Sequence, residues 1–349
     1  MMSDFVQQQH SVCDFDSSDS WVILSPIEQS IKRKIESVGT PLKDWDINIY
    51  RGVLTGYNDA FIINTEKRNE ILDNCRTDEE RKRTEELIRP ILRGRDIKRY
   101  CYDWADLYLI ATFPAKHYDI DLYPAVKEYL LSFAYDYLIE NDNDWVANNY
   151  LEDFCKQKLS QSGQYISIDG KYIYDIKGNK EKARKKTSNK WFETQDSINY
   201  WEDFSKPKLV YMEIQTDNPE EGYPFPCYSY DNTKAVTLNT AYIMSSNSID
   251  VRYVLGILNS RLGKFLVKLY VTQLQERQFR MLAQYVQHFP IVRTDAIKVS
   301  HMVELVDKAI TKDRVAYDRE IDKLAYAIYH LTKEEINYLD NRQLKYIVV

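Results

Sequence analysis

The sequence predicts an α+β protein, with a mixed α/β domain over 46–247 and a helical region with long C-terminal helices over 248–349. Two observations predict this class. Between 46 and 247, short β-rich segments alternate with amphipathic helical segments and turn residues. After about Ser248, apolar residues recur at i, i+3 and i+4, which is typical of helices. The final pattern predicts an unbroken helix of about 30 residues, long enough to brace domains or to pair with a partner helix.

The N-terminal part is expected to be a polar, disordered stretch over 1–20, followed by a short strand and a helix over 21–45. Trp21–Leu24 is a short apolar run. Ser25 and Pro26 then supply an N-cap and a proline at the first helical position. The helix places Ile27, Ile31, Ile35 and Val38 on one face and ends at Gly39.

The α/β domain is expected to contain strands, one hairpin and two helices. The helices are predicted over Thr77–Ile88 and Leu122–Glu140, and the hairpin turns at Asp169-Gly170. The predicted strands lie in INIYRGVLTG and AFIINT, which the turn-forming residues Gly56–Asp59 separate, in DLYLIATFP and in PKLVYMEIQ. Further short strands are predicted in PFPCYSYDNTKAVTLNTAYIM.

Charge is unevenly distributed along the chain. The segment Lys177–Lys190 contributes +6 to a net charge of −6, so the remaining residues sum to −12. One basic segment in an acidic protein favours a local phosphate-binding surface, although a solvated loop would have the same composition. The 28 tyrosines would suit a contact surface or an aromatic core equally well.

The five cysteines are scattered, without zinc-ligand spacing, which is typical of reduced thiols in the cytoplasm. No apolar run approaches the 18 residues expected of a membrane span, so no membrane partner is expected. The five histidines are isolated and are interpreted as structural or surface residues. Glu193 and Asp196 have no visible acid/base partner.

Five groups of motifs follow one another across most of the chain. They are Gly52–Ile63 (GVLTGYNDAFII), Ile88–Ile97 (IRPILRGRDI), Lys190–Gln195 with Phe204–Tyr211 (KWFETQ and FSKPKLVY), Leu258–Leu262 with Phe279-Arg280 and Phe289–Ile291, and Glu320–Leu324 with Tyr329–Glu335. In this order they resemble the TaqI-like C-terminal specificity (target-recognition) domain of type II and IIG restriction–modification adenine-specific DNA methyltransferases.

This resemblance implies a bacterial, cytoplasmic DNA target-recognition module. It also implies two partners, duplex DNA and an adenine methyltransferase domain or subunit. The chain lacks the NPP[YF] string that grips a flipped adenine and the nuclease pattern D…E-x-K, so no catalytic site is expected in it. S-adenosylmethionine, with Mg²⁺ as a further candidate, is expected on the catalytic partner, and no cofactor or metal is expected in this chain.

Three groups of residues are candidates for DNA contact. A glycine-containing loop can approach DNA closely, an arginine fork can bridge phosphates or read guanine, and clustered lysines neutralise phosphates. For each group there is also a structural interpretation: a docking turn, surface salt bridges with Asp96, Asp103 and Asp106, and a flexible insertion. The candidates are Thr55, Gly56, Tyr57 and Asn58; Arg93, Arg95, Lys98 and Arg99; and Lys182, Arg184, Lys185, Lys186 and Lys190.

A fourth group, from Gln273 to Arg280, has side chains able to read base edges. The favoured interpretation is the polar face of a connector between helices. Two other functions stay open at this point. The chain could be a truncated or split part of an adenine methyltransferase or type IIG enzyme with its catalytic domain elsewhere. It could also be an assembly module that binds only protein.

Overall fold

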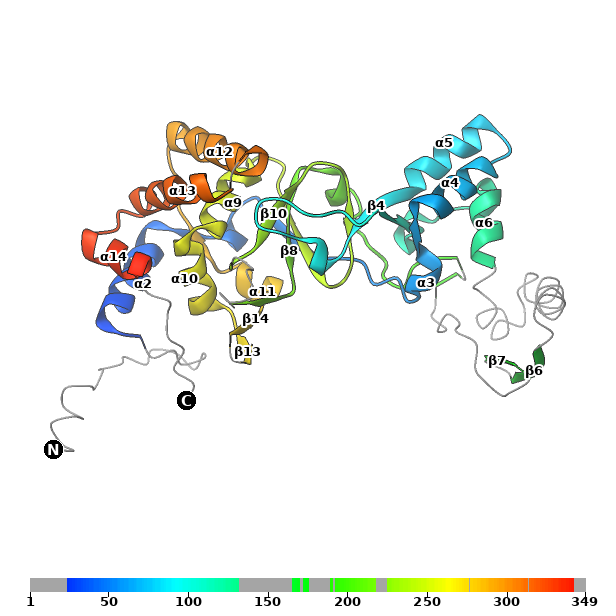
Figure 1. Ribbon diagram of the computed structural model, residues 1–349, viewed down its shortest axis with the longest axis horizontal. Helices are drawn as coiled ribbons and strands as arrows, with labels where there is room; N and C mark the ends of the chain where they lie inside the picture. The colour runs from blue at the N-terminus through cyan, green and yellow to red at the C-terminus, as the bar shows by residue number, and fades with distance from the viewer. Residues whose placement is uncertain are drawn as a thin grey trace.

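The computed structural model describes residues 24–131, 165–169, 172–175, 189–190, 192–217, 225–275, 277–312 and 314–341. These residues form an elongated molecule (Figure 1). The C-terminal helices lie at one end, helices from between residues 65 and 131 lie at the other, and β-sheets lie between them. The predicted α+β class with C-terminal helices is confirmed.

A four-stranded antiparallel sheet lies at the centre, in the order β10 (Tyr228–Asp231), β8 (Lys208–Met212), β12 (Ala241–Ser245) and β2 (Asn48–Arg51). Successive side chains of a strand point to opposite faces. Leu209 and Tyr211 therefore join one hydrophobic core, whereas Val210 joins a second, and all three are fully buried. Both faces of this sheet are covered, which explains why β8 is apolar from Leu209 to Met212.

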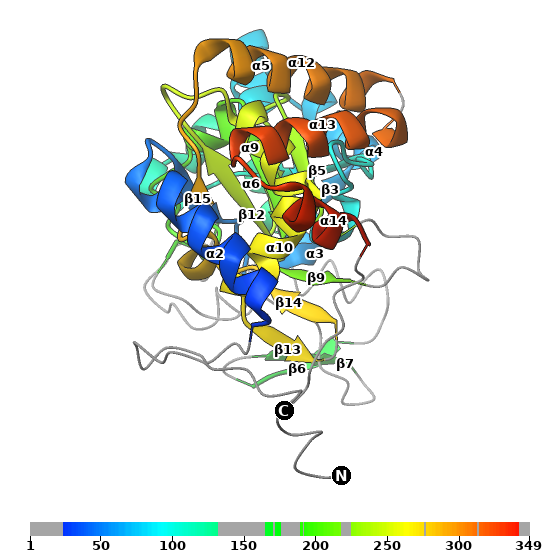
Figure 2. The same cartoon turned by 90° about the vertical axis from the view of Figure 1, so that its left-hand side faces the viewer.

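One face of the central sheet is covered by helices from both ends of the chain. Lys34 Nζ lies 2.6 Å from Glu335 Oε2, which joins the first of these helices to the last. The ribbons of both helices face the viewer in Figure 2. The predicted N-terminal helix is confirmed: it begins after Ser25, buries Ile31 and Ile35 completely and ends at Gly39. The helices of this layer are α2 (Pro26–Val38), α9 (Val251–Asn259), α10 (Arg261–Tyr270), α12 (Ala296–Thr311), α13 (Arg314–Ile328) and α14 (Lys333–Asn341).

The opposite face of the central sheet meets a second, smaller lobe. Its mixed sheet has the order β11 (Val236–Thr237), β4 (Ile88–Leu92), β5 (Leu107–Ile110) and β3 (Ile62–Asn64). The sheet packs against α4 (Thr65–Asp73), α5 (Asp78–Leu87) and α6 (Pro124–Leu131). Its core joins Val210 and Ile243 of the central sheet, so the two lobes share that sheet.

A three-stranded sheet, in the order β13 (Gln273–Gln275), β14 (Gln278–Arg280) and β9 (Ile214–Thr216), lies beside the helical layer. The predicted hairpin around Asp169-Gly170 is confirmed as the pair β6 (Tyr165–Asp169) and β7 (Tyr172–Asp175). The short strands β1 (Thr40–Pro41) and β15 (Pro290–Ile291) pair with one another. The remaining elements are the short helices α3 (Asn58–Phe61) and α11 (Ala283–Val286) and the 3-10 turns η1 (Leu42–Asp44), η2 (Gly94–Asp96), η3 (Pro114–Lys116), η4 (Ile120–Leu122) and η5 (Asp203–Ser205).

Three predicted elements differ from the structure. The long C-terminal helix is wrong, because Lys312 leaves the helical conformation at φ −120° and ψ −112°, and α12 and α13 then both pack on α9. A single straight helix could not bury both apolar stripes against that neighbour. Ala60 and Phe61 are helical and not extended. The predicted strand PKLVYMEIQ is divided at Glu213 into β8 and β9, which belong to different sheets.

The predicted helix over Leu122–Glu140 begins at Pro124, and its residues after Leu131 lie outside the described part of the chain. Among the described residues, no helix combines the length and the apolar character needed to cross a membrane. The domain boundaries at 20, 45 and 247 stay predictions.

Candidate functional site

Hydrogen bonds hold the loop Thr55–Asn58 against the segment that contains Gln195. Thr55 is buried, its hydroxyl donates to Asn58 Oδ1 at 2.6 Å, and its carbonyl accepts from Gln195 N at 3.1 Å. Gly56 has φ +80°, and a Cβ there would lie 3.0 Å from Gln195 Cβ, so only glycine suits this position. Leu54 N donates to Asp196 Oδ2 at 2.9 Å. The first and third motifs therefore dock on one another inside this chain.

Of the four candidates in this loop, Asn58 is exposed and Tyr57 packs partly against the core of the smaller lobe. Thr55 serves the loop and has no access to solvent. The structure thus supports the structural interpretation for Thr55 and Gly56. Asn58 is the most exposed residue of this group, and Gly56 and Tyr57 are half-buried.

The second motif is tied to the first through the turn before β12. A Cβ on Gly52 would lie 2.1 Å from the Leu238 carbonyl oxygen, and one on Gly94 would lie 2.9 Å from the Thr240 carbonyl oxygen. Gly94 N also donates to Thr240 Oγ1 at 3.0 Å. Both glycines are required because two backbones approach closely. The first and second motifs therefore pack together as part of the scaffold of the domain.

The basic cluster over 93–99 divides into paired and exposed cations. Arg93 makes a two-pronged ion pair with the buried Asp96, with Nη2 2.7 Å from Oδ1 and Nε 3.0 Å from Oδ2. The hydrogen bonds with Asp96 raise the pKa of Arg93 above its usual range. Arg99 Nη2 lies 2.9 Å from Asp318 Oδ1 on α13, and that oxygen also accepts from the Tyr100 hydroxyl at 3.0 Å. These ion pairs support the structural interpretation of Arg93 and Arg99, and contact of either residue with DNA stays a prediction.

Arg95 is exposed, and its guanidinium has no hydrogen bond or ion pair with any described residue. Lys98 lies beside it and donates to the Arg95 carbonyl oxygen at 3.3 Å. Lys190 is exposed, with Nζ 5.6 Å from the centroid of the Phe192 ring. The predicted contacts Lys182, Arg184, Lys185 and Lys186 lie outside the described residues. Arg95 and Lys190 are thus exposed predicted cations of the described residues, whereas Lys98 is half-buried.

The stretch from Gln273 to Arg280 joins α10 to α11, as predicted for a connector, but it forms the β13–β14 hairpin. Its strand β14 pairs with β9, where Arg280 lies opposite Ile214. Arg280 Nη2 and Arg51 Nη2 lie 3.0 and 3.2 Å from the Glu213 carboxylate. Alternation over only three residues on each strand was too weak a signal to predict this hairpin.

A buried ion pair joins two neighbouring strands of the central sheet. Lys208 and Asp231 face one another on β8 and β10, and both are almost fully buried. Lys208 Nζ also donates to the Phe204 carbonyl at 2.8 Å, and the Tyr102 hydroxyl donates to Asp231 at 2.8 Å. Burial lowers the pKa of Lys208, whereas the lysine and its neighbouring donors outweigh burial and lower the pKa of Asp231. This pair is inaccessible to a substrate and is structural.

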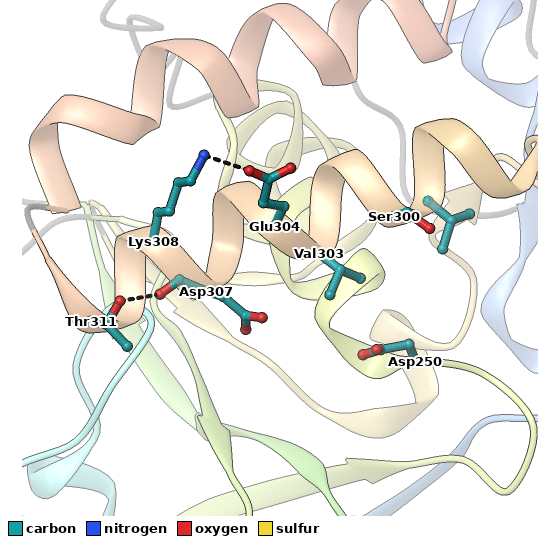
Figure 3. A pocket seen from close by; sticks show the side chains of 8 residues that line it. Asp250, Ser300, Val303, Glu304, Asp307, Lys308 and Thr311 are labelled. Carbon is teal, nitrogen blue, oxygen red and sulfur yellow. Dashed lines mark hydrogen bonds and ion pairs between the residues drawn. The ribbon is translucent and has the colours of Figure 1, made fainter.

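A pocket of about 520 Å³ lies along α12 (Figure 3). Its charged lining is mutually paired: Lys308 donates to Glu304 at 2.6 Å, and Arg252 holds both Asp250 and Asp307. The other lining residues are Val299, Ser300, Val303 and Thr311. These groups form no nucleophile–base pair. In the described part of the chain, no three His, Cys, Asp or Glu side chains could hold a metal ion.

Comparison with known proteins gives the family. A sequence profile of the TaqI-like C-terminal specificity domain matches residues 89–291, more than half of the chain. The chain is 22% identical over 329 residues to a type II methyltransferase, M.XhoI of Xanthomonas vasicola, which confirms the predicted resemblance. The match covers 92% of this chain and 47% of M.XhoI, so the chain spans about half the length of that relative.

Two solved structures are similar to this chain at 12% sequence identity. The type IIG restriction endonuclease BpuSI has a TM-score of 0.42, with 87% of this chain and 33% of BpuSI covered. The type IIL restriction–modification enzyme MmeI, solved in complex with DNA, has a TM-score of 0.47, with 86% and 36% covered. From the profile match, which includes the loop of Arg95 and the β13–β14 hairpin, the chain belongs to the TaqI-like C-terminal specificity domain family.

Proposed function

We propose that the chain is the target-recognition module of a restriction–modification system. It binds duplex DNA at a short sequence and directs an adenine-N6 methyltransferase or endonuclease partner to that sequence. The family is a specificity domain, and the relative at 22% identity is named as a methyltransferase, which supports this proposal. The S-adenosylmethionine and Mg²⁺ sites are assigned to the catalytic partner, a domain or subunit in the bacterial cytoplasm.

The observation that carries the proposal is the state of Arg95. Its neighbours are fixed, because Arg93 is locked to Asp96 and Gly94 is held against Thr240. The guanidinium of Arg95 is nevertheless exposed, with Lys98 beside it. Because the turn is already rigid, little backbone entropy is lost when this cation, which no described carboxylate neutralises, meets a phosphate or a guanine edge. This is the arrangement expected of a DNA contact.

The test is fluorescence anisotropy of the full chain, with its co-purifying partner, on labelled duplexes. Arg95→Glu with Lys98→Glu should weaken duplex binding at least tenfold at low salt, because two phosphate attractions become repulsions. Lys82→Glu on α5 is the matched control, since Lys82 is also exposed, and it should change affinity less than twofold. A chain that binds no duplex with its partner present would refute the proposal.

A second candidate is that the chain is one part of a site-specific adenine methyltransferase or type IIG enzyme whose catalytic domain lies elsewhere. It is favoured by the 47% share of M.XhoI that the chain covers. Mass spectrometry of the native protein distinguishes the two candidates, because a product much heavier than 41.4 kDa would favour the second. An assembly module that binds only protein would leave function unchanged after charge reversal at Arg95 and Lys98.

A further inference from the structure

The β13–β14 hairpin is an exposed ribbon at one side of the molecule (Figures 1 and 2). β13 is the edge strand of its sheet, and all three of its residues are exposed. Gln275 lies directly opposite Gln278, and the pairing shifts register between Gln273 and Gln275, so Leu274 is the extra residue of a bulge. Bulges at sheet edges turn side chains out of the regular ladder and often adjoin functional sites.

The base of this ribbon is firmly held. Phe279 is buried, and its ring stacks on Phe225 with centroids 5.2 Å apart. The Arg280 guanidinium is bound by Glu213. In the turn, Arg277 has φ +68°, and its carbonyl oxygen accepts from Asp217 N at 2.8 Å. The ribbon therefore presents its polar side chains from a fixed backbone, as a recognition element requires.

The exposed surface of this small sheet is unusual for a solvated hairpin. Four large apolar side chains are exposed among the described residues, and two of them, Ile214 (49%) and Leu274 (45%), belong to this one sheet. Beside them are the amides of Gln275 and Gln278 and the guanidinium of Arg277, for which the described residues supply no side-chain partner. Exposed large apolar groups beside polar side chains that water alone can bind are features of a contact surface.

This combination fits the edges of bases. The major groove of B-DNA is about 12 Å wide and admits a two-stranded β-ribbon. A glutamine amide can bind adenine N6 and N7 together, arginine can bind guanine O6 and N7, and an aliphatic side chain can contact the methyl group of thymine. Arg277 also supplies a positive charge that complements the phosphates on either side of the groove.

We propose that the β13–β14 hairpin enters the major groove and that Gln275, Arg277 and Gln278 contact base edges and set the recognised sequence. The inference rests on the proposed DNA-binding function and extends it. In this arrangement Arg95 and Lys98 bind phosphates and position the duplex, whereas the hairpin recognises the bases. Phosphate contacts carry affinity without sequence information, and base contacts carry specificity.

The test compares specificity with affinity. The full chain, with its co-purifying partner, is first used to select its preferred duplex from a randomised library, and then its affinities for that duplex and for a scrambled one are measured. Arg277→Ala, Gln275→Ala and Gln278→Ala should each reduce the ratio of the two affinities roughly 5- to 150-fold, as expected for a lost bidentate contact. Binding to the scrambled duplex should change less than threefold.

Gln284→Ala on α11 is the matched control, because Gln284 is also an exposed glutamine and lies just after the hairpin. It should leave the selected sequence and the affinity ratio unchanged. Thermal melting of each variant distinguishes a loss of the folded structure from a loss of sequence preference.

If a folded variant that combines the three substitutions kept the same preferred sequence, the inference would be overturned while DNA binding stayed intact. An equal loss of affinity for both duplexes would also overturn it, since the hairpin would then hold only phosphates. Absence of all duplex binding by the wild-type chain refutes the proposed function itself. The failures of the two proposals are therefore distinguishable.

Discussion

Arg99 and Asp318 join two parts of the chain that are 219 residues apart, with the guanidinium Nη2 2.9 Å from the carboxylate Oδ1. The pair connects the loop after β4 to α13, and the Arg99 side chain is only 12% exposed. The loop that carries the exposed Arg95 is thereby braced against the helical layer. The loop after β4 and α13 are therefore held together at this point.

Asp318→Ala should lower the free energy of unfolding by about 2–4 kcal/mol, because it leaves a largely buried guanidinium without its partner. Asp73→Ala breaks the exposed Arg81–Asp73 pair, whose Nη1–Oδ1 distance is 3.2 Å. This control should change the free energy of unfolding by less than about 0.5 kcal/mol. Urea denaturation followed by circular dichroism measures both. Equal effects in the two variants would contradict the bracing role.

Asp322 on α13 should make the stability depend on pH. Burial raises its pKa from 3.8 to about 6, with backbone and side-chain contacts from Arg261 opposing the rise. The folded state then holds a proton that the unfolded state has released. Its contribution to stability is complete below about pH 4 and is lost as the pH rises through about 6.

Asp322→Asn keeps an acceptor for Arg261 N, which lies 2.8 Å from Oδ1 in the wild type, and removes the titrating group. Between pH 4 and pH 7 the wild type should lose about 2–3 kcal/mol relative to this variant. Urea denaturation of both proteins at several pH values measures the difference. Parallel curves for wild type and variant would refute the assignment.

Gly52→Ala should be among the most destabilising single-methyl changes in the chain. The added Cβ would meet the Leu238 carbonyl oxygen at 2.1 Å, and the backbone must move to relieve the overlap. We expect a loss of about 3 kcal/mol or more in the free energy of unfolding. Gly56→Ala, which mainly forces a non-glycine residue to adopt φ +80°, should cost about 1 kcal/mol. The reverse order in chemical denaturation would contradict the close-approach argument.

Lys208→Met should lower the free energy of unfolding by about 3–5 kcal/mol, because Asp231 keeps its charge in a buried position without the lysine. Adding Asp231→Asn should restore at least half of the loss, since the remaining Tyr102 and Thr233 hydroxyls can still donate to the amide oxygen. A double-mutant cycle by urea denaturation measures the coupling. Additive losses would show that the two side chains do not act as a pair.

Local signals predicted the local structure. Ser25, Pro26 and the spacing of Ile31 and Ile35 define α2, and the alternation in the sequence of β6 and β7 predicts their pairing. The division at Glu213 could not be predicted, because it depends on Arg51 and Arg280, which arrive from other strands. The break at Lys312 is likewise set by packing on α9.

For the candidate site, the pairing of Arg93 with Asp96 follows from a spacing of three residues. The pairing of Arg99 with Asp318 does not, and for that reason sequence reasoning treated four basic residues alike. The distinction between scaffold cations and exposed cations requires the tertiary structure. The basic residues over 182–186 lie outside the described residues, and their DNA contact stays a prediction.

The central sheet has no solvent-facing side, and this limits how specificities can be exchanged between relatives. A graft cut near residue 247 would separate α9 from Tyr211 and Tyr242 and leave an aromatic face open to aggregation. A transplant that carries residues 24–341 together keeps both faces covered. Replacement of the three exposed residues of β13, by contrast, removes no core side chain. The architecture thus favours exchange of the whole module or of single exposed residues of β13 over a cut at residue 247.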